Sequence, residues 1–288
     1  MTRQLAGWRE SLSMGWPLIM ALLLFIAPVY YEMSGSLWEE ENYSHGPVIL
    51  LVCLWLFWRE LPRYLALQNE GRPIWGGLLS LIAALLYLVG RSQSLPLLEL
   101  PSQIVMLLAL ILLFKGGAGV RVYWFALLFM LFLVPIPGLL LYSLTHVLKQ
   151  QVSVVAETIL FYLDYPIARE GVMLTIGQYQ LLVADACSGM NSIIALSALG
   201  LLYLYLNPQP GWLRVGVILL LIIPIAVVAN LIRVMALILI TYYFGDEAGQ
   251  GFVHSLAGIL LFACSLTLIY LLDNILRLFS KLWGQKYA

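Results

Sequence analysis

Long apolar segments dominate this sequence and limit what it can fold into. Hydrophobic residues make up 62% of the 288 positions and charged residues only 10%, whereas soluble domains carry about a quarter charged residues. A helix that crosses a bilayer needs roughly 20 mostly apolar residues. We therefore predict an all-α integral membrane protein with about eight transmembrane helices. The predicted spans are Met14–Tyr31, Gly46–Trp58, Ile74–Gly90, Leu98–Phe114, Val122–Leu141, Ser188–Leu206, Trp212–Phe244 and His254–Leu276.

The basic residues indicate how these spans are oriented. Lys and Arg are enriched in the cytoplasmic connections of membrane proteins. If the N-terminus with Arg3 is cytoplasmic, eleven of the fifteen basic residues lie on the cytoplasmic side, Arg214 and Lys286 among them. The opposite side carries the acidic segment Glu39–Glu41. We expect a single polytopic domain over residues 1–288 with both termini in the cytoplasm.

One extracytoplasmic connection, residues 142–186, is long enough to hold structure of its own. Its first part, Ser143–Leu163, predicts an amphipathic helix. Its second part, Val172–Val183, contains β-forming residues around Gly177, which predicts a short β-hairpin lying over the membrane surface.

Prolines modify two of the predicted spans. Pro135 and Pro137 interrupt the fifth span and predict a kink or an early end. The seventh span would reach about 50 Å against a hydrocarbon core of about 30 Å. It must therefore tilt, break near Pro224 or project beyond the bilayer.

A cysteine stands where the polar connection enters the sixth span. Cys187 occurs in the run Ala184–Asn191, and a helix start favours a thiolate through its unpaired N–H groups and dipole. Asn191, four residues on, shares its helical face. The alternative is a chance cysteine among small residues at a helix start.

An arginine lies deep in the seventh span. Arg233 follows Asn230 in an otherwise apolar run, and a charge at that depth is functional by default, since its insertion costs roughly 2.5–3.5 kcal/mol. Asn230, one turn earlier, is placed to orient it. The alternative is an arginine whose side chain reaches the outer interface, but the apolar stretch that follows argues against it.

A histidine starts the eighth span on the same side. His254 by itself is typical of an interfacial residue, but Cys187, Arg233 and His254 come from three consecutive spans and reach one membrane face. Cys and His can form a nucleophile–base pair, and Arg can hold an oxyanion or a carboxylate. Short connections predict that these spans pack together. We place the catalytic part at residues 184–258.

Other polar residues have simpler interpretations. His45 could cap the second span, touch substrate or be interfacial, and His146 fits the polar face of the amphipathic segment. Asp185 could orient His254, although a solvated loop carboxylate is the simpler interpretation. Scattered histidines without clustered carboxylates predict no metal site. We expect no cofactor, and the zero net charge leaves no basic surface for nucleic acid.

At these residues the sequence resembles the exosortases, a bacterial membrane family that processes proteins with PEP-CTERM sorting tails. Two wider runs, Tyr165–Asn191 and Ile240–Gly258, look most like the exosortase B subtype. The matching stretches are Ala184–Ser192 (ADACSGMNS), Ala229–Val234 (ANLIRV) and Gly251–Gly258 (GFVHSLAG), with weaker support from Ser44–Gly46 and Val134–Pro137.

The resemblance implies a thiol protease or transpeptidase of the bacterial inner membrane, with its active site on the periplasmic side. Cys187 would be the nucleophile, Arg233 the oxyanion-stabilising or substrate-positioning cation, and His254 the acid/base. Supporting residues would be Ser188, Asn191, Asn230 and His45. The implied partners are PEP-CTERM-tailed precursors, the lipid bilayer and exopolysaccharide biosynthesis proteins.

Two other functions remain open at the level of sequence. In the first, the chain is a transporter in which Arg233 lines a polar path. In the second, it is a catalytically silent scaffold for polysaccharide export. The few polar residues in the cytoplasmic halves of the sixth and eighth spans count against the transporter.

Overall fold

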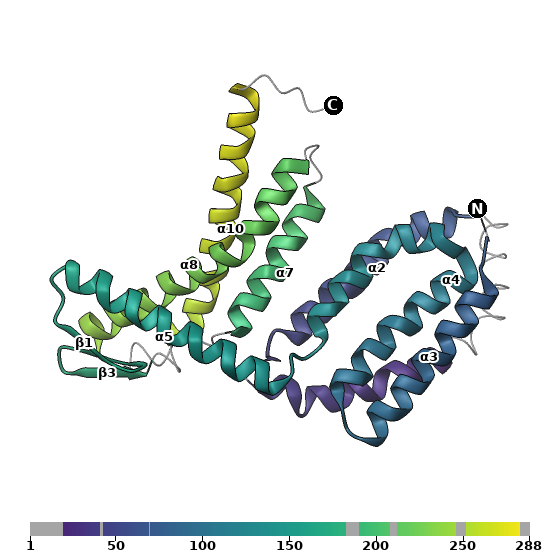
Figure 1. Cartoon of the computed structure of the whole chain (residues 1–288), viewed down its shortest axis with the longest axis horizontal. Coiled ribbons are helices and arrows are strands. Elements are labelled where there is room, and N and C mark those ends of the chain that lie inside the picture. The colour runs from purple at the N-terminus through teal and green to yellow at the C-terminus, as the bar shows by residue number, and fades with distance from the viewer. Residues whose placement is uncertain are drawn as a thin grey trace. The chain divides into compact units, whose positions relative to one another are not determined.

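The computed structural model describes residues 20–40, 43–68, 70–182, 190–207, 212–245 and 252–282. The chain forms two compact units, Met1–Pro135 and Ile136–Ala288, each with its own helices (Figure 1). Each unit is described by itself below. The predicted single polytopic domain stays a prediction.

The first unit is entirely helical in its described part. Residues 20–34 are helical and lead into a short 3-10 turn, η1 (Leu37–Glu39). Three long helices follow: α2 (Gly46–Ala66), α3 (Pro73–Ser92) and α4 (Pro96–Phe129), with η3 (Met130–Leu133) at the end. Each long helix has a proline in its first turn, where no N–H is needed for the helix.

A sharp turn divides α4 into two helices. Gly116 has φ +60°, and a Cβ there would lie 2.2 Å from the Glu70 carbonyl oxygen, so only glycine fits. Beyond the turn, a Cβ on Gly119 would meet Ile111 at 2.9 Å, although eight residues separate the two. The chain therefore reverses at Gly116, between the fourth and fifth predicted spans.

Four described segments are long and apolar enough to cross a membrane: Met20–Glu39, Pro73–Ser92, Pro96–Leu133 and Arg214–Phe244. The third contains the turn at Gly116 and includes the whole of the fourth predicted span and part of the fifth. The total of about eight spans stays a prediction. The early end predicted for the fifth span at Pro135 and Pro137 is confirmed: the helical segment ends at Leu133, short of Leu141, and the next helix begins at Gly138.

The second unit begins with the structured connection. Helix α5 (Gly138–Tyr162) confirms the predicted amphipathic helix and starts five residues earlier than predicted. The predicted hairpin is confirmed as β2 (Met173–Ile176) and β3 (Tyr179–Leu182). A further strand, β1 (Ile167–Glu170), pairs antiparallel with β2 and makes a three-stranded meander.

Glycines allow the two tight turns of this sheet. Gly171 and Gly177 have φ of +62° and +57° and begin two-residue turns that pair Glu170 with Met173 and Ile176 with Tyr179. A positive φ at the first turn position matches the twist of the strands on either side.

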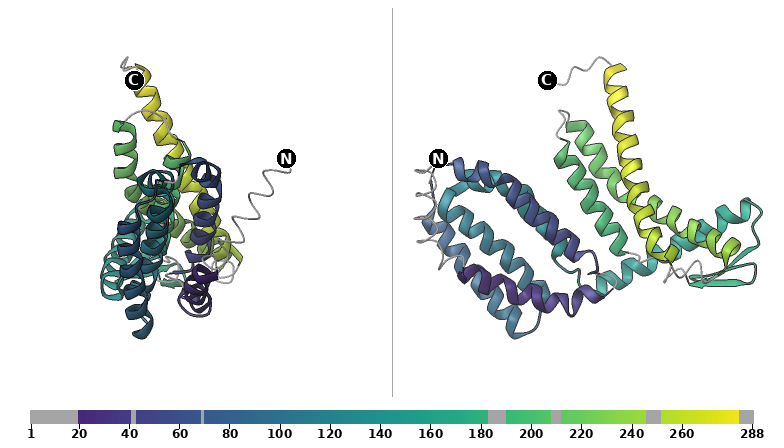
Figure 2. Two further views of the ribbon diagram at one scale, coloured as in Figure 1. Left: turned by 90° about the vertical axis from the view of Figure 1, so that its right-hand side faces the viewer. Right: turned by 180° about the vertical axis from the view of Figure 1, so that it is seen from behind.

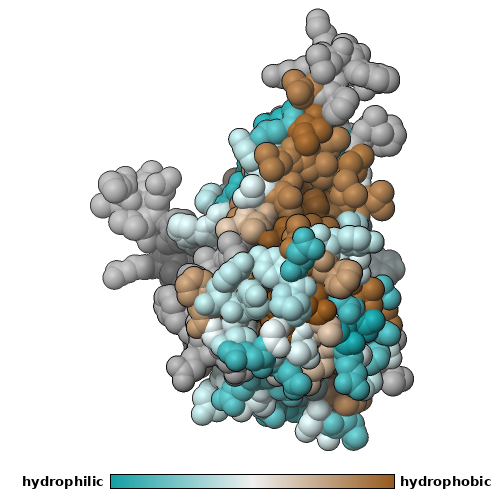
Figure 3. All heavy atoms as spheres, turned by 90° about the vertical axis from the view of Figure 1, so that its left-hand side faces the viewer, coloured by the Kyte–Doolittle hydropathy of each residue, from teal (hydrophilic) through white to brown (hydrophobic). Residues whose placement is uncertain are grey.

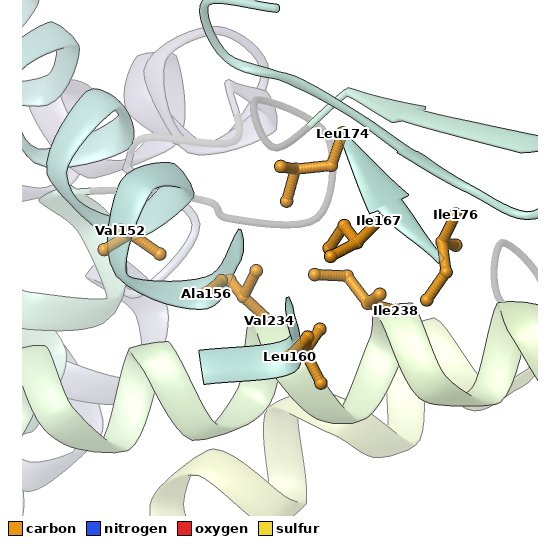
Figure 4. Packing of buried hydrophobic residues seen from close by; sticks show 8 residues of the cluster. All are labelled: Val152, Ala156, Leu160, Ile167, Leu174, Ile176, Val234 and Ile238. Atoms are coloured by element: carbon orange, nitrogen blue, oxygen red, sulfur yellow. The ribbon is translucent and has the colours of Figure 1, made fainter. Parts of the chain in front are cut away.

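The sheet packs on α5 and on α8 (Trp212–Phe244) through a small apolar core. Figure 4 shows these side chains converging from the three elements. The buried members are Val152, Ala156 and Leu160 of α5, Ile167, Leu174 and Ile176 of the sheet, and Val234 and Ile238 of α8. The sheet is thereby fixed to the C-terminal half of α8.

Three helices complete the unit: α7 (Met190–Leu206), α8 and α10 (Phe252–Leu282). They pack on one another, as Figures 1 and 2 show from three sides, so the predicted packing of the last three spans is confirmed. Helix α8 runs through Pro224 without a break.

The surface of the second unit changes character from the sheet to α10. In Figure 3 hydrophilic side chains gather over the sheet and α5, and hydrophobic ones gather over α10. The exposed residues of α10 include Leu266, Leu271, Ile275 and Leu278. Such a surface suits a helix in lipid and a sheet outside it.

Candidate functional site

Arg233 and Asn230 are buried inside the second unit. Arg233 is 5% exposed and Asn230 is fully buried. Their neighbours on α8 join two apolar clusters: Val234 packs with α5 and the sheet, whereas Ala229 packs with Ile193 of α7. Arg233 therefore does not extend into solvent or lipid, which counts against the snorkelling alternative.

The other predicted catalytic residues are only partly within the structure as described. Cys187, Ser188 and Asp185 lie outside the described residues. The backbones of Asn191 and His254 are described, in the first turns of α7 and α10, but their side chains are not. Both helices pack on α8, so the structure brings together the three helices of the predicted site. The meeting of thiol, guanidinium and imidazole stays a prediction.

His45 belongs to the first unit, directly before α2. It occupies the N-cap position and is partly exposed, with Trp38 packed tightly against the adjacent Gly46. Burial raises the pKa of the nearby Tyr43 hydroxyl, and the negative charge of Glu40 adds to this effect. Tyr43 lies two residues before His45, in the turn that leads into α2.

His146 lies on the exposed side of α5, next to Tyr142. This agrees with the interpretation of His146 as a polar-face residue. Within the described residues, no three His, Cys, Asp or Glu side chains lie close enough to hold a metal ion.

A buried ionic cluster near the start of α8 was not predicted. Arg214 donates two hydrogen bonds to the Asp273 carboxylate, one from Nε and one of 2.9 Å from a terminal nitrogen. Tyr203 of α7 and Arg277 of α10 bond the same carboxylate at 2.8 Å and 2.6 Å. We call these four residues the Asp273 cluster.

The charge pattern assigns Arg214 to a cytoplasmic connection at the edge of the seventh span, whereas the structure places it within α8. Arg214 is 5% exposed and Asp273 fully buried, and both lie within helices. Asp273 compensates the arginine and so permits its burial. A sequence signal existed: a carboxylate inside the apolar eighth span is as unusual as the arginine inside the seventh.

The described arrangement can stabilise negative charge. A buried guanidinium such as that of Arg233 interacts with a developing oxyanion or a substrate carboxylate more strongly than it would in water. A nucleophile at the start of α7 and an acid/base at the start of α10 would complete acyl-transfer chemistry.

Comparison with known proteins gives one match. The model of the transmembrane exosortase family matches residues 37–271, which is most of the chain and includes Cys187, Arg233 and His254. Neither the curated proteins nor the solved structures contain a match.

Proposed function

Because the chain belongs to the transmembrane exosortase family, we propose that it is a membrane-embedded cysteine transpeptidase that cuts C-terminal sorting tails at the extracytoplasmic face. Its substrates would be precursors with PEP-CTERM-type tails, and it would pass the cut protein to a surface or exopolysaccharide acceptor. We also assign it to the exosortase B subtype, on the stretches Tyr165–Asn191 and Ile240–Gly258.

The burial of Arg233 carries the proposal. It lies in the C-terminal half of α8, 5% exposed, on the helix that both α7 and α10 contact. Cys187 stands three residues before Met190, the first residue of α7, and His254 is the third residue of α10. A charge is expensive to bury at this depth, so a role in recognising or stabilising negative charge explains its presence.

The proposed topology has about eight spans with both termini in the cytoplasm of a bacterial inner membrane. The polar surface over the sheet and α5, beside the apolar surface over α10, supports placing the connection 142–186 outside the bilayer (Figure 3). Cys187 follows the last strand by five residues, so the proposed cleavage takes place at the periplasmic edge of the membrane.

The chemistry proceeds through an acyl-enzyme. The Cys187 thiolate attacks the scissile carbonyl, a C–S bond forms, and Arg233 holds the resulting oxyanion. The C–N bond then breaks, and His254 gives its proton to the leaving amine of the tail. Next, His254 takes a proton from an acceptor nucleophile or from water, which attacks the thioester and releases the thiolate.

Asn230 and His45 have supporting roles in this scheme. Asn230 is fully buried one turn before Arg233, where its amide can orient the guanidinium. His45 would contact substrate or cap α2, and Ser188 and Asn191 would shape the start of α7 around the nucleophile.

The test is processing of a reporter that ends in Pro-Glu-Pro, an apolar helix and arginines, co-expressed with the chain in a bacterial membrane. Immunoblots measure the shift from precursor to cut product. We expect Cys187→Ala and His254→Ala to abolish the shift and Arg233→Lys to reduce it at least 100-fold, because lysine cannot replace the planar guanidinium. Cys264→Ala is the matched control, since this half-buried cysteine packs in an apolar cluster.

Two results would overturn the assignment. Wild-type processing by Cys187→Ala at equal protein level would exclude this cysteine as nucleophile. If cells with Arg233→Lys no longer transport a solute but still process the reporter, the transporter is favoured. If all three substitutions have no phenotype, the chain is a scaffold.

A further inference from the structure

The Asp273 cluster joins all three helices of the proposed site. Tyr203 comes from α7, Arg214 from α8, and Asp273 and Arg277 from α10. A carboxylate held by three donors from three helices fits one relative placement of those helices. A shift of α8 by a single turn would move Arg214 about 5.4 Å and break both of its bonds to Asp273.

The apolar contacts between these helices discriminate much less between placements. Beside the cluster, Ile218 and Ile222 of α8 pack with Ile269 of α10. Gly200 of α7 leaves room for them: a Cβ there would lie 3.0 Å from Ile222 Cδ1 and 3.3 Å from Ile269 Cδ1. Similar aliphatic side chains one turn away could fill the same space, whereas a buried polar residue specifies helix register.

The sequence offers α8 and α10 few ways to form an ion pair. Asp273 is the single acidic residue of α10, and α8 contains no acidic residue and two cations, Arg214 and Arg233. Pairing Asp273 with Arg214 therefore also keeps that carboxylate away from Arg233.

The cluster is equally far along both helices from the proposed catalytic residues. Arg233 follows Arg214 by 19 residues on α8, and His254 precedes Asp273 by 19 residues on α10. Each separation corresponds to about 28 Å of helix. The helices are consecutive and run in opposite directions, so a slide of one against the other changes the distance between Arg233 and the His254 segment directly.

We propose that Arg214 and Asp273 are positioning residues: their ion pair sets the register of α8 against α10 and so places Arg233 relative to the stretch of α10 that carries His254. The catalytic consequence rests on the proposed function, whereas the helix register does not depend on it. The cluster acts from the end of the helices opposite to Arg233 and the start of α10.

The register is tested by cross-linking, which needs no activity. The full chain carries Ile222→Cys and Ile269→Cys in a background with Cys53, Cys187 and Cys264 replaced by Ala. A protease site between α8 and α10 lets a gel distinguish linked from unlinked helices in membranes. Ile223→Cys with Ile269→Cys is the geometric control, because Ile223 is exposed on α8.

We expect the 222–269 link to fall at least three-fold when Asp273→Asn or the milder Arg214→Lys is added. Glu157→Gln, which breaks an ion pair between α5 and β1, should leave it unchanged. An undiminished link in both Asp273→Asn and Arg214→Lys overturns the proposal.

The catalytic consequence is measured with the native cysteines present. At equal protein amounts, Arg214→Lys should lower the maximal processing rate at least ten-fold and change the half-saturating reporter concentration less than two-fold. A weakened register with a normal maximal rate overturns the positioning role. Absence of reporter cutting by the wild type defeats the proposed function instead, while the cross-link still decides the register.

Discussion

The two buried arginines of α8 have very different surroundings. Arg214 and Arg233 are each 5% exposed and lie 19 residues apart on one helix. Arg214 meets a buried carboxylate and forms part of a cluster that joins three helices. Arg233 lies where α8 passes between two apolar clusters, one with α5 and the sheet and one with α7.

The difference separates an arginine with a structural role from one for which we propose a functional role. The contacts of Arg214 with Asp273 account for its burial, since attraction between the ions offsets their desolvation. The packing around the Arg233 part of α8 is supplied by apolar side chains of α5, the sheet and α7. The two ends of α8 should therefore respond differently to substitution: one through ionic contacts, the other through apolar volume.

The largest expected effect comes from removing the carboxylate of the Asp273 cluster, near the start of α8. Asp273→Ala leaves Arg214 buried without its carboxylate, and removing one partner of a buried ion pair costs about 3–5 kcal/mol. Thermal unfolding of the purified protein in lipid nanodiscs should show a strongly lowered Tm. Asp164→Asn, at an exposed turn after α5, serves as the control. Equal unfolding temperatures for both variants would contradict the structural role of the cluster.

The apolar end should respond to lost volume. Leu174→Ala removes a fully buried side chain from the core that attaches the sheet to α5 and α8. Truncations of this kind cost about 2–5 kcal/mol of stability. Because a small sheet at the edge of the unit can relax into the vacated space, we expect a cost near the lower value. Hydrogen exchange of β1–β3 should accelerate while α10 is unaffected. Leu163→Ala, at an exposed position, is the control, and equal acceleration by both would contradict the core.

The sequence predicted the second unit better than the first because its signals are local. The β-forming residues of Val172–Val183 around Gly177 indicated the hairpin, and the amphipathic pattern of Ser143–Leu163 indicated α5. Strand β1 was missed because Ile167–Glu170 alternates over only four residues and includes two charges. Its pairing with β2 is a tertiary contact that no local pattern reports.

Arg233 was predictable as a charge in an apolar helix, but the ionic partnership of Arg214 was not. Arg233 was identified because a single charge in an apolar run is unusual. Arg214 was assigned to a connection because it lies near the end of such a run, and only the fold brings Asp273, 59 residues later, into contact. The sequence feature that indicates this pair is the presence of opposite charges, Arg214 and Asp273, inside two apolar spans.

The smallest expected effect concerns the ion pair between β1 and α5, two of the elements that form the apolar core at the C-terminal half of α8. Arg169 of β1 donates a 2.8 Å hydrogen bond from Nε to Glu157 of α5, and both side chains are about a quarter exposed. Exposed pairs contribute about 0–1 kcal/mol and weaken further in salt. Glu157→Gln should therefore lower the Tm slightly at low ionic strength and not measurably in high salt. Glu170→Gln, on an exposed residue of the same strand, controls for the loss of a carboxylate.

A large effect of Glu157→Gln would change the comparison between the two ends of α8. If it destabilised the sheet as much as Leu174→Ala does, the sheet would be held to α5 by charge rather than by the core around Leu174 and Ile238. Both ends of α8 would then depend on ionic contacts, and sheet attachment would fall with rising salt. A salt-independent sheet that is sensitive to Leu174→Ala leaves the ionic dependence at the Arg214 end, where burial shields the pair from screening.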